Sequence, residues 1–152
     1  MNSIQHSKWV AAIKPAAILD NSSATATVID CTNYDFVTIA VTLGATDIAM
    51  TALKVQSSDA SGGTYADITG ATFNGGTGLG GATLALPSST DDGQVCIFHI
   101  DMRTQNPFLK VVATFGDGTV GGFISAVACL SRGKIAPTTS TGVADGDVCI
   151  VV

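Results

Sequence analysis

Residues 34–43, YDFVTIAVTL, alternate between two kinds of side chain along their whole length. If the segment is extended, successive side chains point to opposite faces. One face would then carry Val37, Ile39, Val41 and Leu43, and the other Phe36, Thr38, Ala40 and Thr42. Period-two alternation of β-branched residues predicts a β-strand with one face in a hydrophobic core.

Similar segments recur at intervals of about ten residues, separated by runs of Ser, Asp and Gly. We predict further strands at 50–57, 64–73, 82–86, 95–102, 108–115 and 121–130. The predicted turns and loops are 44–47, 57–63, 74–81 and 88–93. Asp117-Gly118 favours a two-residue hairpin, because both central positions of such a turn need positive φ. Residues 121–130 are apolar on both faces, which is typical of a strand buried on both sides.

This pattern predicts an all-β fold, an antiparallel β-sandwich that is jelly-roll-like, with an immunoglobulin-like topology still open. No segment has convincing helical periodicity, and Glu is absent. The expected domains are an N-terminal arm (1–23), the β-sandwich (24–133) and a C-terminal tail or edge strand (134–152).

Charge and hydropathy exclude several function classes. The net charge is −5, and the seven Lys and Arg residues are scattered, whereas nucleic-acid binding needs clustered positive charge. No apolar run approaches the ~18 residues of a membrane-spanning helix. The apolar stretch 9–13 is cut short at Lys14-Pro15, too early for a signal peptide. We expect no direct contact with nucleic acid or membrane, and assembly in a cytoplasm.

Reactive side chains do not form a recognisable site. Cys31, Cys96, Cys129 and Cys149 lack C-x-x-C spacing, so we expect reduced thiols and no zinc. The Gly76–Gly81 run matches G-x-G-x-x-G, but a strand fragment and Pro87 follow it instead of a helix, so a surface loop is expected.

Two other groups of residues resemble a catalytic triad and calcium-binding loops in residue type but not in spacing. His99 and Asp101 share a strand face and Ser125 would complete a triad, but neighbours two apart on a strand are separated by about 6–7 Å, and no nucleophile elbow is present. The Asp-Gly pairs at 92–93, 117–118 and 145–146 lack the regular pattern of a calcium loop. We therefore predict a non-enzyme without catalytic residues, metal ligands or cofactor.

Two long segments resemble a known family. These are IDCTNYDFVTIAVTLGATDIAMTALKVQSSDASGGTYADITG (29–70) and DDGQVCIFHIDMRTQNPFLKVVATFGDGTVGGFISAVACLSRGK (91–134). The shared order is an Asp-aromatic start to a strand, L-K-V-Q-x-S-D, I-D-M-R, F-L-K-V-V and a G-D-G turn. Together they resemble proteins encoded beside major capsid genes in tailed bacteriophages, including cement or decoration proteins of cyanophage-like heads. Pro107 departs from the basic or polar residue expected there.

The resemblance implies a structural virion protein: a jelly-roll-like homotrimer on the capsid exterior that stabilises the shell by bridging major capsid subunits. Its partners would be the major capsid protein and itself. The alternatives are a phage tail, baseplate or fibre-base trimerisation domain, and a carbohydrate-binding β-sandwich.

The candidate partner-binding residues lie outside the well-patterned block, in apolar segments at either end that need burial. They are Ile4, Lys8, Trp9, Val10, Ile13, Ile135, Val148, Ile150 and Val152.

Overall fold

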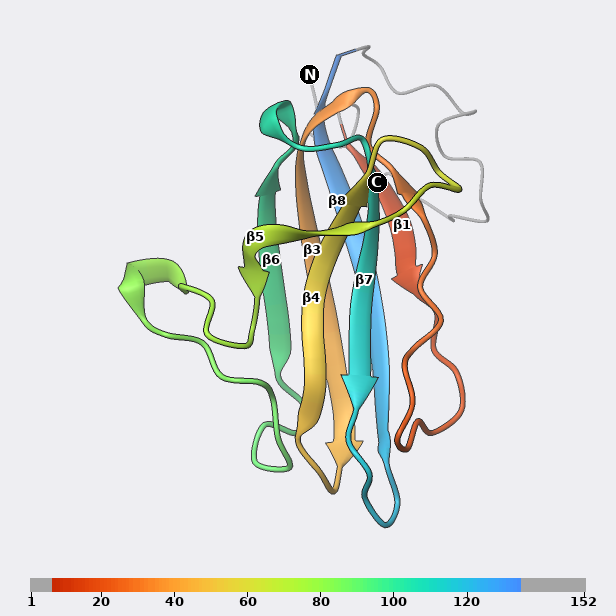
Figure 1. Ribbon diagram of the computed structural model, residues 1–152, viewed down its shortest axis with the longest axis vertical. Helices are drawn as coiled ribbons and strands as arrows, with labels where there is room; N and C mark the ends of the chain where they lie inside the picture. The colour runs from red at the N-terminus through yellow and green to blue at the C-terminus, as the bar shows by residue number, and fades with distance from the viewer. Residues whose placement is uncertain (1–6, 135–152) are drawn as a thin grey trace, which may run out of the picture.

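The computed structural model describes residues 7–134, which form strands, two short 3₁₀ turns and loops, without an α-helix (Figure 1). The strands are β1 (Lys8–Ile13), β2 (Ile29–Asp30), β3 (Tyr34–Thr46), β4 (Met50–Ser58), β5 (Ala66–Thr72), β6 (Val95–Asp101), β7 (Phe108–Phe115) and β8 (Gly122–Gly133). The 3₁₀ turns are η2 (Leu79–Gly81) and η3 (Met102–Thr104).

These strands form two antiparallel four-stranded sheets, which confirms the all-β prediction. The first sheet has the order β1-β8-β3-β6 and the second has the order β2-β7-β4-β5. Figure 1 shows them as two layers, with β4 and β7 in front of β3 and β8. The hydrogen-bonded pairs include β1 with β8, β2 with β7, β3 with β6 and β4 with β5. The first half of the described chain therefore runs back along the second half, strand by strand.

The inner faces of both sheets contribute to one hydrophobic core. The alternation predicted for β3 is confirmed, because Val37, Ile39, Val41 and Leu43 are all buried. The same holds for β7, whose inward residues are Leu109, Val111, Ala113 and Phe115, and for β6, whose inward residues are Cys96, Phe98 and Ile100. In these three strands, period-two patterning thus correctly assigned which side chains are buried.

Two predicted boundaries are wrong. The turn expected at 44–47 lies mostly within β3, which continues through Thr46 before a bend at 47–49. Thr46 is held in the sheet because it pairs with Gly122 and donates its N–H to the Asp92 carboxylate at 2.9 Å. The strand expected at 82–86 is reduced to an isolated bridge between Thr77 and Thr83.

The predicted hairpin at Asp117-Gly118 is also wrong. β7 belongs to the second sheet and β8 to the first, so the connection at 116–121 crosses between layers instead of joining neighbouring strands. The positive φ in this connection lies at Gly121 (80°), not at its centre. A local turn signal could not distinguish a hairpin from a crossing between sheets.

The strand β8 is buried on one face only, contrary to the prediction. Gly122, Ile124, Ala126, Ala128 and Leu130 face the core, whereas Phe123 and Val127 are exposed. At the other end of the chain, residues 8–13 of the expected N-terminal arm form β1, the edge strand beside β8.

Candidate interaction surfaces

The solvent-facing side of the first sheet, here called the outer face, carries large apolar side chains on three of its strands. Their exposed fractions are 53 % for Val95, 52 % for Trp9, 49 % for Ile97, 46 % for Phe123 and 42 % for Val127. Single exposed apolar residues are ordinary, but a cluster across one sheet marks an interaction surface.

The strand register brings these side chains into neighbouring rows. One row across the four strands contains Trp9, Cys129, Thr38 and His99. The next contains Ala11, Val127, Ala40 and Ile97. Neither row contains Asp, Lys or Arg, although the chain has a net charge of −5. The centre of the outer face is therefore free of Asp, Lys and Arg and largely apolar, with Thr38 and His99 as polar side chains.

Charged residues gather at one end of the outer face, around Phe36. The Arg103 and Arg132 guanidinium groups lie 5.1 and 5.4 Å from the centre of its ring. Arg103 also pairs with the Asp101 carboxylate at 2.5 Å, and these hydrogen bonds lower the pKa of Asp101 to about 2. Asp101 is therefore ionised at neutral pH and its charge is already matched by Arg103. This cluster marks the polar border of the apolar surface.

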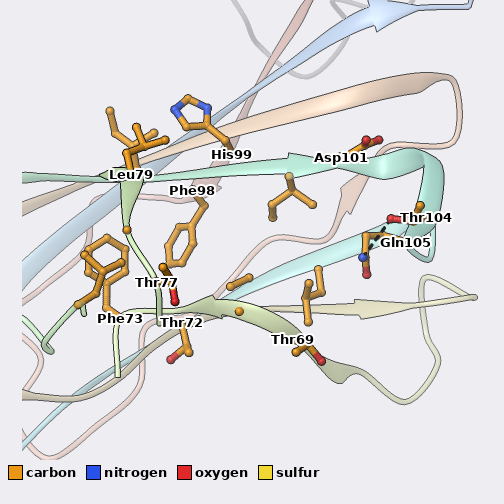
Figure 2. Close-up of a pocket in the computed structure, with 17 residues that line it drawn as sticks. Thr69, Thr72, Phe73, Thr77, Leu79, Phe98, His99, Asp101, Thr104 and Gln105 are labelled. Carbon is orange, nitrogen blue, oxygen red and sulfur yellow. Dashed lines mark hydrogen bonds between the residues drawn. The ribbon is translucent and has the colours of Figure 1, made fainter. Parts of the chain in front are cut away.

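A second feature, here called the edge groove, lies between β6 and β5 and has a volume of about 420 Å³ (Figure 2). The loop after β5 supplies Thr77, Gly78 and Leu79 to its wall. The Phe73 ring meets the Phe98 ring edge-on, with 5.1 Å between their centres. The groove thus lies along a sheet edge and has an apolar base.

The three residues considered as a possible catalytic triad, His99, Asp101 and Ser125, are not brought together. His99 Nδ1 lies 3.1 Å from Thr38 Oγ1, and the Asp101 carboxylate bonds to Arg103 instead of His99. Ser125 pairs with Thr42 on β3, four residues along that strand from Thr38, a separation of about 13 Å. Among residues 7–134, no group of three or more His, Cys, Asp or Glu side chains is placed to hold a metal ion.

The other sequence signals have structural roles. The glycine-rich 76–81 run forms a loop around η2, as predicted, and most of it is exposed, although Gly76 is buried. Cys31, Cys96 and Cys129 are free thiols, and burial raises the pKa of Cys31 to about 12. The Asp91 carboxylate accepts hydrogen bonds from Ser88 within its own turn.

The candidate partner-binding residues occupy different environments. Trp9 points outward, whereas Val10 packs against the core and Ile13 is only 2 % exposed. Lys8 is half-buried at the start of β1. The others, Ile4, Ile135, Val148, Ile150 and Val152, lie outside the described residues.

Val95, Ile97 and Val127 were not predicted from the sequence as surface residues. A usable signal was present, since strands 95–102 and 121–130 carry apolar residues on the face opposite their core side chains. The second apolar face of 121–130 was predicted to be buried, whereas Phe123 and Val127 on that face are exposed.

Within the described part of the chain, no helix is long and apolar enough to cross a membrane. No protein-family model matches the sequence, and no match was found among curated proteins. The outer face and the edge groove are therefore the features from which a function can be inferred.

Proposed function

We propose that this chain is a structural virion protein that binds the outside of a tailed-phage capsid as a homotrimer and stabilises the shell by bridging major capsid subunits. The supporting observation is the centre of the outer face of the first sheet, which lacks Asp, Lys and Arg and has Trp9, Ile97 and Val127 exposed. Burial of apolar surface contributes about 25 cal/mol per Å². A protein that acts by covering surface needs no catalytic group.

The proposal includes a jelly-roll β-sandwich. The strand pairing supports it, because each strand of the first half pairs with the corresponding strand of the second half taken in reverse order. The pairs are β1 with β8, β2 with β7, β3 with β6 and β4 with β5. A long ribbon folded back on itself and wrapped so that it alternates between two sheets gives this order. Double-sheet domains of this type occur in viral capsids as well as in lectins.

Trp9 is the residue of the predicted set that best fits a partner contact. It is 52 % exposed at the edge of the outer face, and Trp is enriched among residues that dominate binding energy at interfaces. Because Ile13 packs within the core, we propose contacts through Trp9 and the outer face, together with the segment 135–152.

A trimer on a shell gains from repetition. Each copy would contribute the same apolar surface. Closed three-fold symmetry would bury that surface in all three copies and leave no copy with an unpaired interface. A trimer that touches several capsid subunits at once also binds more tightly than any single contact, because later contacts form at high effective concentration.

Quantitative mass spectrometry on particles of the phage that encodes the chain tests this function. We expect on the order of hundreds of copies per head, retained after tails are removed, because the shell repeats its binding site many times. A dozen or fewer copies that separate with the tails would instead support the trimerisation domain. Glycan binding without association with particles would support the carbohydrate-binding domain.

A further inference from the structure

The free edge of β6 is the least protected edge among the described strands. Natural sheets discourage unwanted pairing with short edge strands, charges, bulges or proline. β1 carries Lys8 and a bulge, β2 has two residues, and β5 has an irregular register around Gly70. β6 reads VCIFHID and pairs with β3 in unbroken register.

The backbone groups of β6 that point to this edge can be identified from the ladder with β3. Leu43 donates its N–H to the Gln94 carbonyl at 3.1 Å. In this register the backbone N–H and C=O groups of the even-numbered residues of β6 point toward β3. Because these directions alternate along an antiparallel strand, Val95, Ile97 and His99 turn their backbone groups to the free edge. No described residue makes a backbone hydrogen bond to them there.

The edge groove gives an incoming strand room and apolar neighbours on both sides. On the inner side lie Phe98 and Ile100, and on the outer side Val95 and Ile97 are about half exposed. Figure 2 shows Phe98 directed toward the groove and His99 directed away from it. A matching strand therefore needs apolar side chains on both of its faces.

The segment 148–152, VCIVV, is apolar at every position and rich in β-branched residues. We propose that β6 accepts this segment from a neighbouring copy of the chain, as an added strand of the first sheet. Main-chain hydrogen bonds to Val95, Ile97 and His99 would supply affinity, as in other cases of strand addition. The choice of a neighbouring copy, though not of the edge, rests on the proposed self-association.

Chain length permits exchange between copies. The roughly 13 residues between Lys134 and Val148 span at most about 45 Å when fully extended. One four-stranded sheet is about 19 Å wide, so this length allows the segment to reach beyond the first sheet of its own chain.

The acceptor edge is tested with a chain that lacks residues 148–152 and a synthetic peptide of residues 145–152. We expect the peptide to bind and to shift the amide NMR signals of Val95, Ile97 and His99. Ile97→Pro in the shortened chain removes an outward N–H without breaking the β3 ladder, so affinity should fall at least about tenfold. Ile97→Ala keeps that N–H and is the matched control, with affinity within about threefold. An absent interaction, or equal binding to the Ile97→Pro variant, would overturn the proposal.

Exchange between copies is tested by mixing two defective chains. Full-length Ile97→Pro retains the donor segment, and the isotope-labelled shortened chain retains the acceptor edge. Mixing should restore hydrogen-exchange protection of the Ile97 and His99 amides in the shortened chain. Protection of these amides in a full-length chain that sediments as a monomer would show insertion into its own edge and overturn the exchange. Neither experiment requires a capsid, so failure here is separable from failure of the proposed function.

Discussion

Asp47 holds the crossing between the two sheets in place although its side chain is exposed. Its carboxylate accepts backbone N–H groups from Thr119, Val120 and Gly121 at 2.6, 2.7 and 3.0 Å. These hydrogen bonds favour the ionised form and lower the pKa of Asp47. The contact spans more than seventy residues of sequence, so no local pattern could have predicted it.

The Asp47 contact predicts a pH-dependent loss of stability on Asp47→Ala. A carboxyl whose pKa is lower in the folded chain stabilises it above the unfolded value, and this contribution disappears as pH falls through the folded value. The variant should melt several degrees lower than the parent at pH 7, and the difference should narrow as pH falls below about 4. Thermal unfolding from pH 7 to pH 3 measures this.

The control is Asp59→Ala, since Asp59 is exposed and its side chain has no hydrogen-bond partner among the described residues. A constant difference for Asp47→Ala at every pH would contradict the electrostatic explanation.

The close packing around Gly122 predicts that a larger side chain at this position will lower the stability of the fold. A Cβ at this position would overlap the Phe115 ring and lie 2.9 Å from Thr46 Cβ and Oγ1. Gly122→Ala should therefore cost about 1–3 kcal/mol, because the surrounding core must shift. Gly62→Ala, with no atom within 4 Å of the added Cβ, should change stability by less than about 0.5 kcal/mol. Urea unfolding compares the two, and equal midpoints would contradict the close packing.

At the scale of elements, the sequence predicted strands well and connections poorly. Alternation is a property of each strand alone, so β3, β6 and β7 were placed with the correct buried faces. Which sheet a strand joins depends on distant partners, so the β7–β8 crossing was mistaken for a hairpin. The exposed positions of β6 and β8 were apolar in the sequence, but only the register shows that they form one surface.

Because β1 pairs with β8 and contributes buried residues, deletion of the N-terminal segment should lower stability much more than substitution of its exposed residue Trp9. Deletion of residues 1–13 removes the partner of β8 and the buried residues Ala12 and Ile13, so stability should fall by at least about 2 kcal/mol. Trp9→Ser should leave the free energy of unfolding within about 0.5 kcal/mol of the parent but weaken the proposed binding to capsids. Denaturation and capsid co-sedimentation on the same samples separate these effects. Unchanged capsid binding by Trp9→Ser would exclude Trp9 from the contact.

At the scale of the whole molecule, the distribution of charge is uneven. The outer face of the first sheet has no Asp, Lys or Arg in its two central rows, whereas Lys54 and Asp67 form an ion pair of 2.7 Å on the second sheet. The two sheets therefore differ in what they present to a partner. The outer face of the first sheet has apolar side chains that an interface would bury, whereas the second sheet carries charged side chains that remain favourable in water.

This asymmetry predicts the effect of a single charge on assembly. If the proposed trimer buries the outer face, Val127→Asp should convert it to monomers in sedimentation experiments, because burial of an unpaired carboxylate is costly. The folded monomer should lose less than about 0.5 kcal/mol, since Val127 is 42 % exposed. Thr51→Asp, at an exposed site on β4, is the matched control and should remain trimeric. A trimer that survives Val127→Asp would place the contact elsewhere.

The pairing of β1 with β8 has a consequence for synthesis of the chain. Lys8 is among the first described residues to leave the ribosome, but its partner Leu130 is among the last. The first sheet is therefore completed only after translation of β8, and such long-range pairing makes folding slow, on the order of milliseconds to seconds. Until then β1 lacks its neighbour, and its backbone N–H and C=O groups remain free to pair with another chain.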